Sequence, residues 1–180
     1  INKLVGRKIS IVSHKVQTTR FCIRGICNYH LSSKLKSQII FVDTPGIFLP
    51  KRRLEKAMVT AAWSELNLTD KVVFIHDVLK KIDNNTKEII EKIFEKKSDV
   101  ILVLNKIDLL PKEDLLKKIS EIKNLYNFEE TFLISAKNGS GCNKLIEYLA
   151  KKMPSHSFFY DENTISDIPQ SILASEITRE

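Results

Sequence analysis

Several residue types are scarce in this 180-residue chain, and each scarcity narrows the class of protein. The three cysteines, Cys22, Cys27 and Cys142, match no metal-binding spacing. Residues 1–8 show no apolar signal core, so we expect no export signal and expect the cysteines to be reduced thiols in a cytosol, packed as small apolar side chains. No apolar run approaches the roughly 20 residues that a membrane-spanning helix needs. We therefore expect a globular protein without a transmembrane segment.

Glycine is scarce too, with only five residues in the chain. No two of them stand five positions apart, so the phosphate-binding motif G-x-x-x-x-G-K-[ST] is absent from these 180 residues. The chain starts at Ile1 rather than Met, and residues 177–180 carry no helix stop signal. We expect the chain to begin inside a helix and to be truncated at both ends.

Positive charge is in excess, with a formal net charge of +7 that comes mainly from lysine. A basic surface is compatible with an RNA or an anionic membrane as partner. The lysines are scattered along several predicted helices, so a solvated surface explains them equally well.

Apolar strands alternate with amphipathic helices along most of the chain. The strands are expected at residues 20–28, 38–43, 72–75, 100–104 and 131–134. Helices are expected at residues 54–66, after Asn85, after Pro111 and at residues 143–153. The first two strands predict an antiparallel hairpin, and Asn85 with Glu88 predicts a capping box. The later strands are apolar throughout, which predicts an α/β fold with a mostly parallel sheet, buried on both faces and flanked by helices.

The strongest chemical signal is the run Asn105, Lys106, Ile107 and Asp108, directly after an apolar strand. Ligands of such sheets bind at the carboxyl ends of the strands. A carboxylate at Asp108 can accept hydrogen bonds from the ring N1–H and the exocyclic amine of guanine, whereas adenine offers no matching pair of donors. Asn105 would brace the neighbouring loops, and the stem of Lys106 would lie along the base. An ordinary strand-to-loop turn is the alternative.

A second run, Ser135, Ala136 and Lys137, follows the next strand. The backbone N–H of Ala136 can donate to the guanine carbonyl oxygen, because a small side chain lets the backbone approach. A simple turn would also explain this tripeptide.

Two further segments predict contacts with phosphate and Mg²⁺. One predicted strand ends in the run Asp43, Thr44, Pro45, Gly46 and Ile47. There the Asp43 carboxylate can hold a Mg²⁺-bound water, and the Gly46 N–H can approach a phosphate. Thr19, in the loop before the first strand, is a candidate Mg²⁺ ligand. The alternative for the first segment is a Pro-Gly turn that closes the strand, and the alternative for the segment with Thr19 is a polar loop.

No catalytic residue is assigned. Ile47 stands where a polar side chain would orient a water, and an apolar group cannot do so. His76 and Asp77 end a strand near the predicted site, and we interpret both as structural residues.

These four motifs, in this order, resemble the Era family of bacterial ribosome-assembly GTPases. Residues 8–20 and 43–47 are similar to its two switch regions, and residues 105–108 and 135–137 to its guanine-specificity elements. Residues 174–180 resemble the start of its RNA-binding KH domain. The resemblance covers nearly the whole chain. It implies a GTPase domain at residues 1–154, a linker at 155–169 and the beginning of a KH domain at 170–180.

The resemblance also implies a function. GTP or GDP with Mg²⁺ would be the cofactors, and GTP hydrolysis would drive a switch in assembly of the small ribosomal subunit. Small-subunit ribosomal RNA would bind through the KH domain beyond Glu180. The protein would be cytoplasmic, with peripheral association at the inner membrane allowed. The alternatives are a truncated, non-hydrolysing remnant or binding module, and a tRNA-modification or double-domain GTPase.

By the same resemblance, the chain begins just after the phosphate loop and lacks the strand before it. In the family, that strand lies between the strands at residues 39–42 and 72–75. Because neighbouring strands lie about 4.8 Å apart, its loss would separate these two by roughly 10 Å and leave backbone groups unpaired. We predict that the isolated chain is inactive toward GTP and either unstable or rearranged.

Overall fold

A computed structural model describes residues 1–10, 22–33, 35–46 and 53–167. The chain divides into two compact units, one formed by residues 1–68 with 146–180 and the other by residues 69–145. No helix within the described ranges has the length and apolar character that spanning a bilayer requires. Cys142 is buried, and Cys22 and Cys27 are half-buried, as the sequence predicted.

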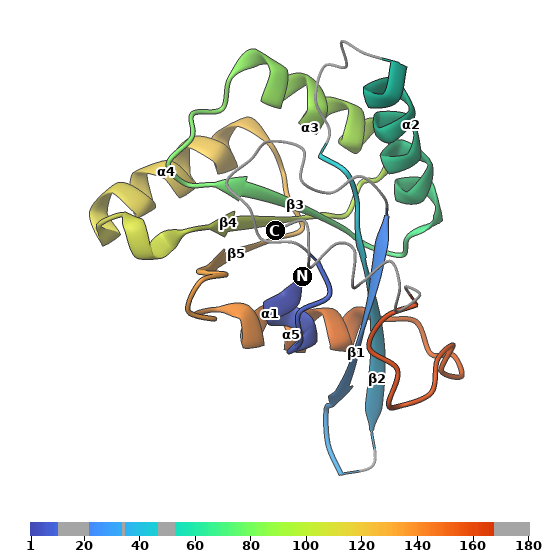
Figure 1. The fold of residues 1–180 in the computed structure, drawn as a ribbon. Coiled ribbons are helices and arrows are strands. Elements are labelled where there is room, and N and C mark those ends of the chain that lie inside the picture. Colours follow the sequence, from blue (N-terminus) through green and yellow to red (C-terminus); the bar gives the residue numbers. More distant parts are fainter. Residues whose placement is uncertain (11–21, 34, 47–52, 168–180) are drawn as a thin grey trace. The chain divides into compact units, whose positions relative to one another are not determined.

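A parallel sheet of three strands forms the centre of the 69–145 unit. It consists of β3 (Val72–Asp77), β4 (Val100–Asn105) and β5 (Glu130–Ile134), in that spatial order. Helix α3 (Asn84–Lys96) connects β3 to β4, and helix α4 (Lys112–Leu125) connects β4 to β5 (Figure 1). The predicted α/β class and the parallel sheet are confirmed.

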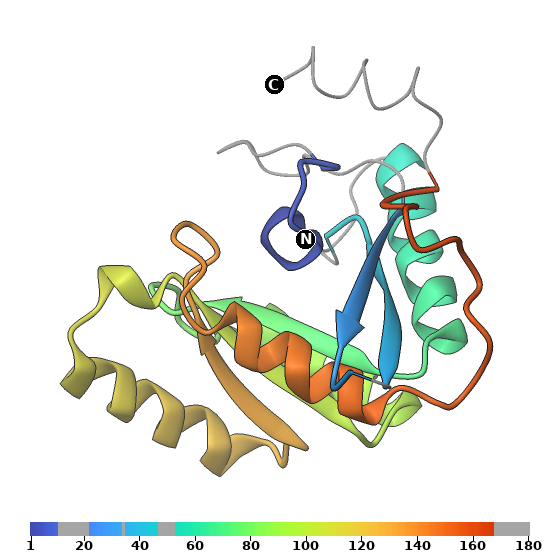
Figure 2. The ribbon, with the colours of Figure 1, turned by 90° about the horizontal axis from the view of Figure 1, so that it is seen from below.

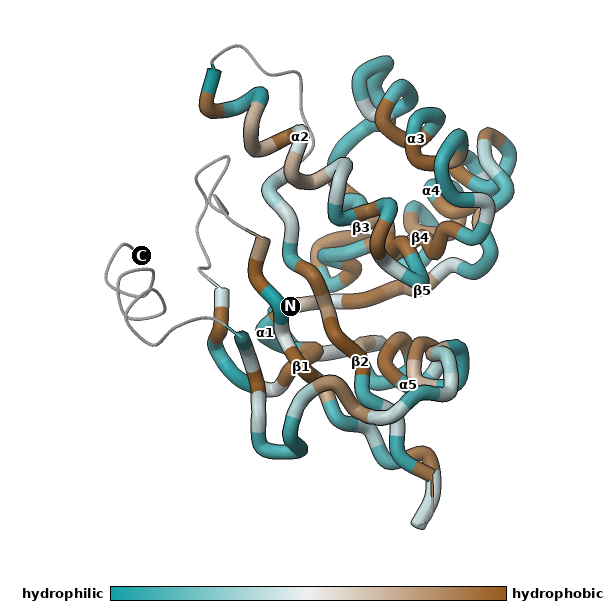
Figure 3. Tube along the Cα trace, turned by 90° about the vertical axis from the view of Figure 1, so that its right-hand side faces the viewer, coloured by the Kyte–Doolittle hydropathy of each residue, from teal (hydrophilic) through white to brown (hydrophobic). Residues whose placement is uncertain are grey.

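The core of this unit lies against the central strand, β4. All residues from Val100 to Leu104 are at most 1% exposed. The buried cluster that two β4 residues form with their neighbours consists of Val78, Leu102, Leu104, Leu115 and Ile122. Figure 3 shows hydrophobic colour along the strands of this sheet and an alternation of the two colours along α3. The amphipathic helices predicted from the sequence thus cover an apolar strand.

Burial of β3 was predicted wrongly in part. Ile75 is 55% exposed, and the residues Val72 to Phe74 are only half-buried. Among the described strands, β3 pairs with β4 alone, so one of its edges has no partner strand. A continuous apolar run is therefore not sufficient to predict burial on both faces when the strand lies at an edge.

The N-terminus of α3 also differs from the prediction. Asp83, not Asn85, is the N-cap, and its carboxylate accepts hydrogen bonds from the Thr86 backbone N–H (2.8 Å) and hydroxyl (2.6 Å). The predicted capping box of Asn85 and Glu88 is wrong because the helix begins before Asn85. Pro111 directly precedes the first residue of α4, as expected.

An antiparallel hairpin organises the other unit and confirms a second prediction. Strand β1 (Ile23–His30) pairs with β2 (Lys36–Asp43), with Ile23 opposite Asp43. The remaining helices are α1 (Asn2–Val5), α2 (Arg53–Leu68) and α5 (Cys142–Lys152), with the 3-10 turn η1 at Ile107–Leu109 in the 69–145 unit.

The N-terminal segment packs closely on this hairpin at Gly25. A Cβ at Gly25 would lie 2.5 Å from Ile9 Cδ1 and 2.7 Å from Val5 Cγ2. Asn2 holds the same segment together, because its Oδ1 accepts the backbone N–H groups of Ile9 and Ser10, each at 2.9 Å. A larger residue at this position would require these side chains to shift.

Residues 155–167 lie along the hairpin in both ribbon views (Figure 1 and Figure 2). The Oε1 atom of Gln38 accepts the backbone N–H groups of Phe159 (3.0 Å) and Tyr160 (3.1 Å). The backbone N–H of Ile26 donates to the Ile165 carbonyl at 2.9 Å. This segment, predicted as a linker, is thus attached to the strands by backbone and side-chain hydrogen bonds.

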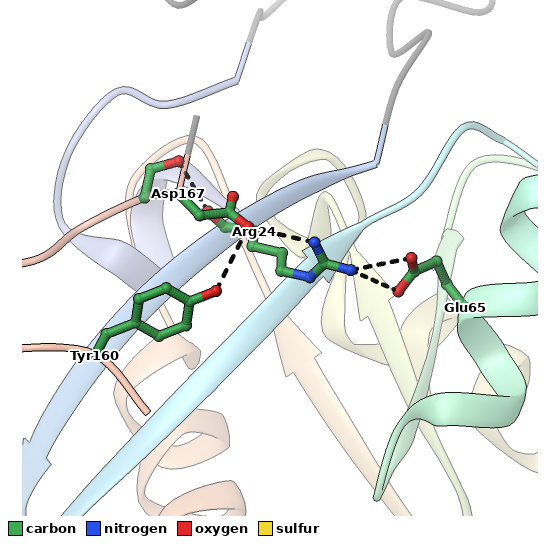
Figure 4. Close-up of polar contacts among 5 residues, drawn as sticks. Arg24, Glu65, Tyr160 and Asp167 are labelled. Carbon is green, nitrogen blue, oxygen red and sulfur yellow. Dashed lines mark hydrogen bonds and ion pairs between the residues drawn. The ribbon is translucent and has the colours of Figure 1, made fainter. Parts of the chain in front are cut away.

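Arg24 joins this segment to α2, as Figure 4 shows. Its guanidinium donates to both oxygens of Glu65 on α2, at 3.1 and 3.3 Å, and to Asp167 at 3.3 Å. The hydrogen bond to Asp167 raises the pKa of Arg24, against burial and with help from the Glu65 charge. The Arg24 side chain therefore holds both α2 and residues 155–167 to strand β1.

Candidate functional site

Polar residues gather where the strands of the parallel sheet end. In the register of the sheet, Asp77 lies opposite Asn105, and Asn105 lies opposite Ile134, so the three carboxyl ends share one edge. The two predicted guanine-specificity runs follow β4 and β5 at this edge. The structure thus brings residues 105–108 and 135–137 together.

Asn105 links these two runs directly. Its Oδ1 accepts the backbone N–H of Ala136 at 2.9 Å, which is the bracing contact that the sequence suggested. The same bond engages the N–H that we expected to donate to guanine. A base carbonyl at this position would either share that N–H with the Asn105 side chain or take the place of Asn105 as its acceptor.

Asp108 presents an available carboxylate. It lies in η1 and is exposed, and the structure shows no hydrogen bond or ion pair between it and any residue of the described ranges. The turn that carries it is closed by a hydrogen bond from the Leu109 N–H to the Lys106 carbonyl at 3.0 Å. An exposed carboxylate on a closed turn can accept two N–H groups without giving up an internal contact.

Lys106 has an unusual backbone and a defined side-chain partner. With φ 70° and ψ 34° it is the only non-glycine residue of the described ranges with positive φ. This left-handed conformation costs about 1–2 kcal/mol in an L-residue. The Nζ atom lies 2.7 Å from Oδ2 of Asp77, at the end of the neighbouring strand. Asp77, interpreted from the sequence as structural, therefore contacts a residue of the predicted site.

Asp77 and His76 differ in environment although they are adjacent. Burial alone would raise the pKa of Asp77, but hydrogen bonds from Lys106 and the Leu79 N–H outweigh it and hold the pKa below its usual value. His76 is 6% exposed, and its Nε2 lies 3.2 Å from the Lys80 carbonyl oxygen. Burial lowers the pKa of His76, which favours the neutral ring. His76 packs inside, as the sequence suggested, whereas Asp77 reaches the site.

The loop after β5 is held in one shape by its own backbone. Ser135, which is 1% exposed, donates its N–H to the Ser140 carbonyl and accepts from the Gly139 N–H. Gly141 has φ 75°, and a Cβ there would lie 2.1 Å from the Leu133 carbonyl oxygen. Lys137 is exposed. Ala136 is thus presented on a fixed loop.

The predicted phosphate and Mg²⁺ segment belongs to the other unit. At the end of β2, Oδ2 of Asp43 accepts the Ser10 hydroxyl at 2.8 Å. Thr44 is half-buried and Pro45 is buried, whereas Gly46 is exposed with open space where a Cβ would stand. Thr19 and Ile47 lie outside the described residues.

Asp43 was predicted to lie beside Mg²⁺, and the residues around it indicate how the ion would be held. No group of three or more His, Cys, Asp or Glu side chains in the described ranges could hold a metal ion. Mg²⁺ commonly takes one or two carboxylates and completes its shell with waters and substrate phosphates. A single carboxylate at Asp43 thus fits an ion whose other ligands come from a nucleotide and waters.

Comparison with known proteins identifies the family. The model of the 50S ribosome-binding GTPases matches residues 1–106. The chain belongs to this family. It is 47% identical over its full length to GTPase Era of Rhizobium meliloti (strain 1021) and 46% identical to GTPase Era of Agrobacterium fabrum. The chain spans 56% and 55% of the length of these relatives.

Solved structures of Era agree with this assignment. Era in complex with MgGDPNP and a segment of 16S ribosomal RNA matches 99% of this chain with a TM-score of 0.91 and 35% identity. An Aquifex aeolicus Era variant bound to GDP·AlF4⁻ matches with a TM-score of 0.90 and 35% identity. The chain covers 60% of each of these structures. The resemblance to the Era family is confirmed.

Proposed function

We propose that the complete protein binds GTP and GDP and hydrolyses GTP as a switch in assembly of the small ribosomal subunit. The observation that carries the nucleotide assignment is the Asp108 carboxylate, which has no partner among the described residues and is exposed on a closed turn that directly follows Asn105 and Lys106. Asn105 is itself bound to the loop that presents Ala136.

Base selection follows from the hydrogen-bonding groups of this edge. Asp108 accepts the N1–H and the exocyclic amine of guanine, and the stem of Lys106 lies along the ring. Adenine would turn the lone pair of its unprotonated N1 toward the carboxylate. Because hydrogen bonds to charged groups contribute about 1.5–3 kcal/mol each, this mismatch rejects adenine. Asn105 holds the loop of Ala136, and the guanine carbonyl oxygen shares the Ala136 N–H with Asn105 or takes its place.

The proposed contacts to the terminal phosphates are Asp43, Thr44, Pro45, Gly46 and Ile47. The residues proposed to face Mg²⁺ are Asp43 and Thr19. When bound, Mg²⁺ would neutralise charge on the phosphate oxygens. Gly46 supports this role because no atom of the described residues lies within 4 Å of the place where a side chain would stand. Ile47 cannot orient a water, so we expect slow intrinsic hydrolysis.

The ribosomal role rests on the Era relatives. One of them is known in complex with 16S ribosomal RNA. We propose that the complete protein binds small-subunit ribosomal RNA through a KH domain that begins at residues 170–180, and that it works in the cytoplasm. Peripheral association with the inner membrane stays a prediction.

Nucleotide titration of the complete protein tests the proposal. We expect GDP to bind at least about 100-fold more tightly than ADP, since the carboxylate loses its donors with adenine. Similar affinities for the two nucleotides would refute it.

The gene sequence upstream of Ile1 tests the enzyme assignment separately. A G-x-x-x-x-G-K-[ST] motif there supports a hydrolase, whereas an in-frame start near Ile1 supports the non-hydrolysing remnant. The 180-residue chain by itself should not hydrolyse GTP, because it lacks the phosphate-binding amides and lysine of that motif.

A further inference from the structure

We propose that Asp77 is a positioning residue for guanine binding, which acts by fixing the side chain of Lys106. The inference rests on the proposed guanine site and adds a residue to it from a third strand. Asp77 ends β3, whereas the residues assigned from the sequence follow β4 and β5.

The first argument is geometric. Oδ2 of Asp77 lies 2.7 Å from Nζ of Lys106, while Oδ1 accepts the Leu79 N–H at 3.0 Å. Both carboxylate oxygens are therefore used. Because the second contact fixes the carboxylate on its own backbone, the first holds the lysine at a defined place relative to the sheet.

The backbone around Asp77 is anchored as well. Asp77 is paired in register with Asn105, and the Val78 N–H donates to the Asn105 carbonyl at 3.1 Å. The Lys80 N–H donates to the Asp77 carbonyl at 2.9 Å. The anchor of Lys106 is thus tied to Asn105, the residue that braces the second specificity loop.

Lys106 needs such an anchor because packing does not hold it. Its side chain is 50% exposed, whereas that of Asp77 is only 17% exposed. A lysine stem has several rotatable bonds and loses much rotamer freedom when it is held in one place. The left-handed backbone fixes one end of the stem and Asp77 fixes the other. A base that stacks on a stem already in place need not order it on binding.

A double-mutant cycle on GDP affinity of the complete protein tests this role. Asp77→Asn keeps the shape of the side chain and can still accept the Leu79 N–H, but it removes the charge that faces Lys106. We expect GDP to bind about fivefold more weakly, the effect of losing a partly exposed ion pair. In a Lys106→Met background the same substitution should change affinity by less than about 1.5-fold, because the two residues act as one unit.

Two further variants separate positioning from folding. Asp77→Glu keeps a carboxylate near Lys106 and should recover most of the affinity. Asp99→Asn is the matched control, because it removes an ion pair with Lys71 before the start of β4. It should leave GDP affinity unchanged whatever it does to thermal unfolding.

The outcomes distinguish this inference from the proposed function. If the wild-type protein does not bind GDP, both fail. If it binds GDP but Asp77→Asn weakens binding equally in both backgrounds, or Asp77→Glu is as weak as Asp77→Asn, Asp77 does not act through Lys106. In that case the guanine site stands and the positioning role is overturned.

Discussion

Replacing Asp108 by Asn should change the base that the protein selects. An asparagine at this position keeps a carbonyl that can accept the N1–H of the base. Its amide, however, presents N–H donors where the carboxylate presented a second acceptor. The exocyclic amine of guanine would meet a donor, whereas the carbonyl of xanthine at the same ring position would meet its partner. We therefore expect a switch from guanine toward xanthine.

The structure sets the size of this effect. Asp108 is exposed and unpaired within the described residues, so the substitution should change the free energy of unfolding by no more than about 0.5 kcal/mol. Binding loses one charge-assisted hydrogen bond and gains a donor–donor clash, together about 3–6 kcal/mol. GDP affinity should fall by about 10²- to 10⁴-fold, since 1.4 kcal/mol corresponds to a factor of ten.

Competitive titration of the complete protein with GDP and XDP measures this exchange. Asp70→Asn is the matched control, because Asp70 is another exposed aspartate of the same unit and lies outside the predicted site. A variant Asp108→Asn that binds GDP within threefold of wild type would refute the assignment of Asp108. So would an equal loss of GDP binding in the control.

Three further predictions concern stability and are measured on the complete protein. Gly141→Ala should lower the free energy of unfolding by at least about 2 kcal/mol, because strain at φ 75° adds to overlap with a backbone carbonyl. Gly139→Ala, with φ 87° and open space, should cost only about 1 kcal/mol, and equal losses would contradict the reasoning. Arg24→Ala should cost about 1 kcal/mol and increase hydrogen exchange in residues 158–167, whereas Lys151→Ala, which removes an ion pair with Glu147 inside α5, should not. The folded-state pKa of His76 is lowered, so its contribution to stability is present above about pH 6.5 and lost as pH falls through the lower value. Denaturant unfolding should show that the free energy of unfolding falls less between pH 7.5 and pH 5.5 in His76→Gln than in wild type. An equal fall in the two proteins would contradict the prediction.

Local sequence patterns were sufficient for much of this fold. The hairpin of β1 and β2, the buried strand β4 and the start of α4 after Pro111 each follow from neighbouring residues, through apolar runs and the fixed φ of proline. The contact between Asn105 and Ala136 was also predictable, because parallel strands bring their carboxyl ends to the same edge.

Other features depend on pairings that the sequence does not display. Ile75 is exposed because β3 lies at an edge of the described sheet. Asp83 caps α3 because the backbone turns there, and Asn85 has an equally favourable side chain. The role of Asp77 could have been suspected from its place at the carboxyl end of the strand beside β4. Its partner became evident only from the distance to Lys106.

The central claim is that a carboxylate at Asp108 recognises the exocyclic amine of guanine. IDP tests it most directly, because hypoxanthine keeps the N1–H and the carbonyl of guanine and lacks only that amine. Wild-type protein should bind IDP about 10- to 150-fold more weakly than GDP, the effect of one hydrogen bond to a charged group. Equal affinity for IDP and GDP would contradict the account.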